Sequence, residues 1–364
     1  MKIGARTLKT GIAILISLAI PFILGFPEVS DLAAISAIYS LQPSVKKSFG
    51  VVKERILANT LGGIVAVLMS LALGNSLLTI AFASALLIAI LHQLKLDSVI
   101  GLAAVTLIVI MLTEKDAIVA DAILRVLATI IGVVVTFFVN TLVLPPKYDK
   151  RLLTKIDNVT DELTKYTRAS LRKNSQFAIL KEDLKWIRKE LRSMEQLLSL
   201  LIDQNSFWYL KKPYSSLRVV AVYRQFIEAS KAACHLISAL HKSENIYNHF
   251  PQNTRIIIRE RVETLMSAHE QILMKFNGRI MPDDVNFIAY KASLRKTFMT
   301  TFFSEASLES YMKNDYGQSN SVIHLMSAIL EYEEELQHLN ILVRSYIKHH
   351  PGIYRINLEH TERD

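Results

Sequence analysis

The fold is decided by a segment that occurs twice, 70 residues apart. Residues 55–62 read RILANTLG, and residues 125–132 read RVLATIIG. In the same register, LAAIS at residues 32–36 corresponds to LAAVT at residues 102–106. Chance can match leucine and alanine between two apolar helices, but it rarely also matches an arginine and a glycine. The sequence therefore predicts an internal repeat, with units at about residues 8–75 and 78–145.

Six apolar runs fill this region. They are Leu8–Phe26, Asp31–Leu41, Ile56–Leu73, Leu77–Leu94, Val99–Leu112 and Ala122–Leu144. The longer runs can cross about 30 Å of hydrocarbon as helices. The second and fifth are short, so they need flanking polar residues, a tilt or a re-entrant path. We expect about six transmembrane helices within residues 1–146. Because each unit holds three, the second is inverted, as in many secondary transporters.

Charged residues are concentrated after the two prolines at 145 and 146. Residues 1–145 hold only 10 of the 42 Lys/Arg and 7 of the 33 Asp/Glu, in a chain that is 51% hydrophobic. Lys46 and Lys53 fall between the second and third runs, whereas Glu114 and Asp116 fall between the fifth and sixth. Cytoplasmic loops are rich in Lys and Arg. We therefore expect both termini in the cytoplasm, and the net charge of +9 needs no nucleic-acid partner.

Residues 147–364 have amphipathic patterns instead. Apolar residues recur at alternating intervals of three and four from Phe177 to Leu201 and from Val322 to Tyr346. This spacing is typical of helices that pack along a seam. Since no strand pattern competes, we predict an all-α chain whose second domain is a cytosolic bundle of five to six helices. The glutamates of residues 331–335 are expected on a solvated face.

Arg55 and Arg125 are the main candidates for binding a substrate. Each opens a predicted span, and Gly62 or Gly132 follows two turns deeper. An arginine within a membrane costs about 2.5–3.5 kcal/mol on insertion scales, and its guanidinium can grip a carboxylate with two hydrogen bonds. Alternatively, the arginine side chains extend to the membrane–water interface, or they pair with Asp31, Asp121 or helix-end carbonyls. The glycines have an ordinary alternative role in close helix packing.

Further candidates are weaker. Gln42 and Pro43 interrupt the second run, and a proline there frees backbone carbonyls for a transport site, although a simple loop would explain it equally. Thr60 could donate into a pore or back to its own helix. Asp31 and Asp121 could couple transport to protons, but residues near span ends often cap helices.

The sequence contains no recognisable motif for catalysis, metal binding or ATP binding. The single cysteine, Cys234, forms no intramolecular disulfide, and no His, Cys and acidic spacing resembles a metal site. There is no phosphate loop or nucleophile elbow in the sequence. We therefore expect no enzyme activity, cofactor, metal or ATP-driven transport.

The string IYSLQPS at residues 38–44, followed by Ser48, Arg55, Thr60 and Gly62, resembles the aromatic acid exporter family of bacteria. That family belongs to a larger group with the fusaric acid resistance proteins and, more distantly, the plant aluminium-activated malate channels. The resemblance implies six spans, a homodimer in the bacterial plasma membrane and an anion path lined by arginines at the starts of spans three and six.

Carried over, those arginines are Arg55 and Arg125. Two departures are Asn59, where relatives often have glycine, and Ile130, where the second copy lacks the threonine. We expect efflux or passive conduction of organic anions, such as aromatic carboxylates. The alternative is a membrane-anchored interaction or sensory protein whose cytosolic bundle binds a partner. Matched arginines and a broken helix favour transport, because an anchor needs neither.

Overall fold

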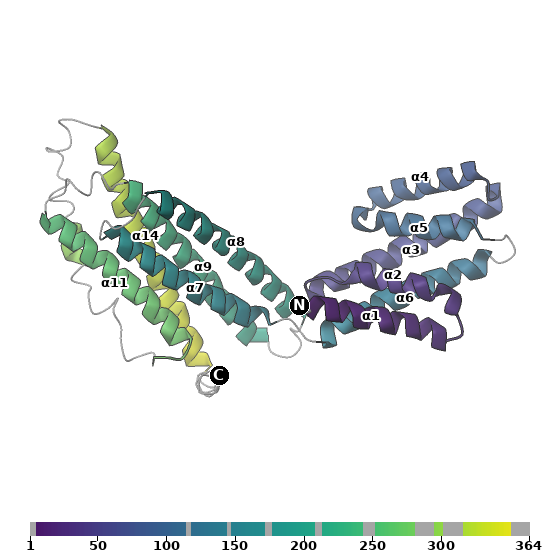
Figure 1. The fold of residues 1–364 in the computed structure, drawn as a ribbon, viewed down its shortest axis with the longest axis horizontal. Helices are drawn as coiled ribbons and strands as arrows, with labels where there is room; N and C mark the ends of the chain where they lie inside the picture. The colour runs from purple at the N-terminus through teal and green to yellow at the C-terminus, as the bar shows by residue number, and fades with distance from the viewer. Residues whose placement is uncertain are drawn as a thin grey trace. The chain divides into compact units, whose positions relative to one another are not determined.

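The computed structural model describes residues 5–113, 118–143, 147–171, 177–207, 213–242, 252–280, 295–300 and 316–350. The chain divides into two compact units, Met1–Pro146 and Lys147–Asp364, called here the N-terminal and C-terminal units. Every regular element in the described ranges is a helix (Figure 1). The all-α prediction is therefore confirmed for these residues.

In its described residues the N-terminal unit has six α-helices. They are α1 (Ala5–Ile23), α2 (Ser30–Ser40), α3 (Val45–Leu73), α4 (Leu77–Gln93), α5 (Ile100–Met111) and α6 (Ile118–Leu142), with short 3-10 turns η1 (Pro27–Val29) and η2 (Asp97–Val99). Within the described ranges, three segments are long and apolar enough to cross a membrane: Arg6–Ile23, Lys46–Leu73 and Ile118–Leu142. The helices α4 and α5 are apolar but shorter. Helix α2 has 11 residues, so it is about 16 Å long.

The bounds of these helices recur at the spacing found in the sequence. Helices α1 and α4 end at Ile23 and Gln93, and α2 and α5 begin at Ser30 and Ile100, each pair 70 residues apart. The contacts cross between the halves of the unit: α2 packs against α6, α5 packs against α3, and α3 packs against α6 (Figure 1). Both halves therefore contribute residues to each of the buried apolar clusters of the unit.

Two glycines lie where these helices cross. A Cβ atom built at Gly132 would lie 2.1 Å from the carbonyl oxygen of Ala33 on α2. One built at Gly62 would lie 3.2 Å from the carbonyl oxygen of Ala103 on α5. Both glycines permit close backbone approach, which fits the packing role considered above. The approach at Gly132 leaves no room for any side chain.

Helix α3 begins well before the apolar run that predicted it. The Ser44 side chain accepts a hydrogen bond of 3.2 Å from the backbone N–H of Lys47, which is the usual N-cap contact. Lys46 and Lys53 therefore lie on the first turns of α3, so the prediction that they lie in a loop is wrong. Hydropathy alone placed the start too late, because these turns are charged. Arg55 lies about 15 Å along the axis from Val45.

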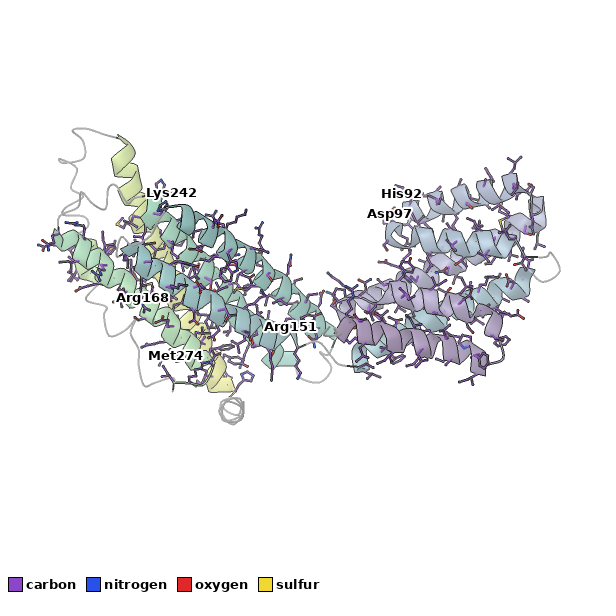
Figure 2. The ribbon with its side chains drawn as sticks, in the orientation of Figure 1. His92, Asp97, Arg151, Arg168, Lys242 and Met274 are labelled. Carbon is purple, nitrogen blue, oxygen red and sulfur yellow. The ribbon has the colours of Figure 1, made fainter. Side chains whose placement is uncertain are left out.

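The C-terminal unit is built from long helices around a common core. They are α7 (Tyr148–Leu171), α8 (Phe177–Phe207), α9 (Pro213–Lys242), α11 (Gln252–Phe276) and α14 (Tyr316–His349). Helix α14 packs along α9 and α11, and α7 packs against α8 and α9. Side chains fill the spaces between them, and Arg168 on α7 contacts Glu263 and Glu270 of α11, each at 3.4 Å (Figure 2). The described apolar residues of both predicted seams are buried, except Tyr346, which is partly buried.

Glu333 lies inside this core. It is 3% exposed and forms an ion pair with the buried Arg261, so a solvated face is the wrong prediction for this residue. Glu333 is buried next to Tyr332, but nothing in the sequence shows that Arg261 lies opposite Glu333. Nearby, Nδ1 of His269 lies 3.0 Å from the Tyr332 hydroxyl. Burial lowers the pKa of His269 to about 4, so this imidazole is neutral at neutral pH.

Candidate functional site

Arg55 is buried against the C-terminal end of α2. Its side chain is 6% exposed; Nη1 donates to the carbonyl oxygen of Ser36 at 3.1 Å and Nη2 to that of Tyr39 at 2.9 Å. The Tyr39 carbonyl lies in the last turn, where no further helical N–H reaches it. The Nε atom is buried and has no hydrogen-bond partner among the described residues. Those residues also place no carboxylate in ion-pair contact with Arg55.

Arg125, at the equivalent position in the second repeat, has a different partner. Its Nε donates to Oδ2 of Asp121 at 2.6 Å, and the Thr113 hydroxyl donates to the same oxygen at 2.8 Å. Asp121 and Arg125 are i and i+4 on α6, so they share one helix face. In the first repeat the position of Asp121 is occupied by Val51. The charge of Arg125 is therefore compensated by a neighbour that Arg55 lacks.

A second buried cation, Lys9 of α1, lies in the same network as the break after α2. Its Nζ donates to the carbonyl oxygen and to Oδ1 of Asn140 on α6, both at 3.1 Å. In turn, Nδ2 of Asn140 donates to the carbonyl oxygen of Gln42 at 3.0 Å and to the Ser48 hydroxyl at 2.8 Å. Lys9, Ser48 and Asn140 are all buried.

The sequence argument missed Lys9 and Asn140. Both residues fall inside apolar runs, Leu8–Phe26 and Ala122–Leu144, that were predicted as membrane spans. The signal that could have found them is a polar residue within each of two otherwise apolar runs. Because they lie 131 residues apart, only the fold reveals that they pair.

Some of the remaining predicted site residues lie in the network of Lys9 and Asn140, and others lie outside it. Gln42 contributes through its backbone carbonyl, and Pro43 follows it in the break. Asp31 is exposed and accepts a hydrogen bond from the backbone N–H of Leu32 at 2.8 Å. Arg125 lies about 22 Å along α6 from Asn140, and Asp121 lies one turn farther. The structure thus places Gln42 and Pro43 in the network at the α2 break. It places Asp31, Asp121 and Arg125 outside that network.

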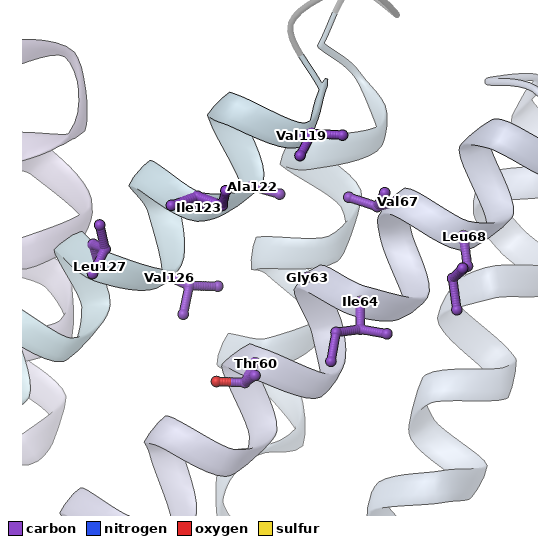
Figure 3. Close-up of a pocket in the computed structure, with 10 residues that line it drawn as sticks. All are labelled: Thr60, Gly63, Ile64, Val67, Leu68, Val119, Ala122, Ile123, Val126 and Leu127. Atoms are coloured by element: carbon purple, nitrogen blue, oxygen red, sulfur yellow. The ribbon is translucent and has the colours of Figure 1, made fainter.

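Thr60 lines an apolar groove between α3 and α6, shown in Figure 3. The groove has a volume of about 370 Å³, and Ile64, Leu68, Ile123 and Leu127 form much of its wall. The Thr60 hydroxyl donates to the carbonyl oxygen of Ile56 at 2.7 Å, so its proton is used within its own helix. None of the residues that line the groove is charged, and the groove therefore offers little to an anion.

Aromatic side chains lie next to the polar network in both α3 and α6. Phe49 follows Ser48, and its ring centroid lies 6.0 Å from that of Phe137. Lys53 places its Nζ 4.6 Å from the centroid of the Phe49 ring. Phe49 is 42% exposed, so its ring lies at the surface of the unit beside the buried network.

The chain is similar to a family model and to several curated bacterial proteins. The model of "Aromatic acid exporter family member 1" matches residues 1–143. The UPF0421 protein YgaE of Bacillus subtilis is 32% identical, over 99% of this chain and 100% of its own length. A UPF0421 protein of Oceanobacillus iheyensis is 25% identical over 92% of this chain and 94% of its own. The family model thus covers the N-terminal unit, and these relatives extend through the C-terminal unit as well.

Proposed function

The chain belongs to the aromatic acid exporter family, and on this premise we propose that it exports organic anions across the bacterial plasma membrane. Carboxylates, aromatic ones included, are the proposed substrate class. The observation that carries this proposal is the buried Arg55, which contacts only neutral oxygens in the described ranges. A buried charge without a counter-charge is costly, and the cost is offset when an anion binds to it.

Arg55, not Arg125, is the proposed anion-binding arginine. Asp121 already compensates Arg125, so a passing carboxylate would have to compete with an ion pair of 2.6 Å. Arg55 holds the broken end of α2, where Gln42 and Pro43 leave helical geometry. Its Nε–H is the donor that a carboxylate would take.

We also propose that α1 to α6 form six spans arranged as a 3+3 inverted repeat, with the C-terminal unit in the cytoplasm and two copies forming a homodimer. The matched helix bounds support this arrangement, as do the exchanged contacts of α2 with α6 and α5 with α3. The helices α2 and α5 are shorter than the other spans, and the 3-10 turns η1 and η2 directly precede them and extend their path through the bilayer. An anion site at the end of α2 would lie below the membrane surface.

The topology follows from this arrangement and can be tested on α4. In a variant in which Cys234 is replaced by serine, single cysteines would be placed at the exposed Ser76 and Lys95, on either side of α4. We expect a membrane-impermeant thiol reagent to label position 76 from outside intact cells and position 95 only after permeabilisation. Cysteine at Lys46 should behave like position 95, and residues 114–118 like position 76. Labelling of 76 and 95 from one face would refute the six-span arrangement.

The function is tested by flux in proteoliposomes loaded with an aromatic or an aliphatic carboxylate, with and without a proton gradient. We expect Arg55→Gln to lower carboxylate flux per folded protein about tenfold, since it removes a charge-assisted hydrogen bond. Arg55→Lys should retain part of the flux, because it keeps the charge without the planar fork. Arg125→Gln is the matched control and should lower flux less. Absence of carboxylate flux in the wild-type protein would refute the proposed function.

A further inference from the structure

Lys9 is the second buried cation of the N-terminal unit whose described partners are all neutral. Its ammonium has three N–H donors, of which two bind Asn140. Arg55 likewise uses two of its five N–H donors on carbonyl oxygens. Among the described residues no carboxylate is in ion-pair contact with either side chain. Both cations therefore keep unused N–H donors.

The two cations serve the same short segment of chain. Arg55 binds the carbonyl oxygen of Tyr39, and Lys9 is joined through Asn140 to the carbonyl oxygen of Gln42. Tyr39 and Gln42 lie on either side of the end of α2 at Ser40. Both cations are thus linked to the same helix end, and an anion bound at that end would balance their charge.

Capping of helix ends does not by itself require these charges. The carbonyl oxygens of Tyr39 and Asn140 lie in the last turns of α2 and α6, where a cation is favourable. A neutral donor also suffices there, because the Thr136 hydroxyl donates to the carbonyl oxygen of Ala37 at 3.1 Å. The use of a buried lysine and a buried arginine therefore calls for a ligand that is itself charged.

We propose that Lys9 and Arg55 together form a two-cation site for one carboxylate, with Asn140 as the residue that positions Lys9. This inference rests on the proposed function and adds the binding group that the arginine alone does not supply. A carboxylate has two oxygens, so it can accept from both cations at once. The amide of Asn140 is fixed by Gln42 and Ser48, and its Oδ1 therefore points to Lys9 rather than away from it.

The test is the KM and kcat for benzoate flux by the full chain in proteoliposomes. We expect Lys9→Met to raise KM about fivefold or more, with little change in kcat, since a charge-assisted hydrogen bond to the ligand is lost. Lys9→Arg should restore KM to near the wild-type value. Arg6→Met removes an exposed cation from the same helix and should leave KM unchanged. A purely structural role would instead lower the amount of folded protein and leave KM as it was.

A second variant keeps the test decisive if Lys9→Met does not fold. Asn140→Asp keeps the size of the side chain and gives Lys9 a carboxylate partner of its own, and it also removes the N–H donors to Gln42 and Ser48. It should raise KM at least as much as Lys9→Met does, because the internal ion pair competes with the ligand. Wild-type flux with unchanged KM in Asn140→Asp, or in a folded Lys9→Met, would overturn the two-cation site and leave the proposed function standing. No benzoate flux in the wild type would instead overturn both.

Discussion

Val51→Asp is expected to lower carboxylate flux about fiftyfold while the protein still folds, because it cancels a buried cation and adds a repelling anion. Val51 is half-buried on α3 and stands one helical turn before Arg55, as Asp121 stands before Arg125. The substitution therefore builds in the first repeat the ion pair that the second repeat already has. Its effect should exceed that of Arg55→Gln, which only removes the attraction.

Flux per folded protein in proteoliposomes measures this effect, and Val51→Asn is its matched control. Asparagine has the shape of aspartate without the charge, so it should keep most of the flux. Combining Val51→Asp with Arg55→Gln should give little further loss, since both changes act on the same charge. Wild-type flux in Val51→Asp would mean that the charge of Arg55 is not used in transport.

Much of the N-terminal unit could be predicted from its sequence, because apolar runs and repeats are properties of the chain itself. The family was recognised from the segment around Gln42 and Arg55, and the match over residues 1–143 confirms it. The start of α3 was predicted too late, because the prediction followed the apolar run and not the N-cap signal at Ser44. By contrast, pairing with Asp121 was one of the alternatives considered for the arginines, and the i and i+4 positions of Asp121 and Arg125 on one helix explain it.

The rest of the site depends on contacts that no local pattern encodes. Arg55 binds backbone carbonyls, which every residue has, so its partners leave no trace in the sequence. Lys9 meets Asn140 only because α1 packs against α6. The burial of Glu333 similarly depends on Arg261 reaching it from another helix. Long-range polar partners of this kind are where sequence reasoning failed in both units.

Gly132→Ala should destabilise the N-terminal unit by about 3 kcal/mol or more, at the upper end of what overpacking costs. The added Cβ would lie 2.1 Å from a backbone oxygen of Ala33, and a backbone cannot rotate away as a side chain can. Helix α2 would have to move off α6. The same movement would pull the end of α2 away from Arg55 and Asn140, so flux should fall together with stability.

Thermal unfolding and the yield of monodisperse protein in detergent measure this loss, with two other glycines as references. A Cβ atom at Gly101 would meet nothing within 4 Å, so Gly101→Ala should be neutral or slightly stabilising in its helix. Gly62→Ala, with its nearest contact at 3.2 Å, should fall between the two. The expected order of stability is therefore Gly101→Ala, then Gly62→Ala, then Gly132→Ala. If Gly132→Ala unfolded at the same temperature as Gly101→Ala, α2 and α6 would not be in backbone contact. The described position of the α2 end relative to Asn140 would then also be wrong.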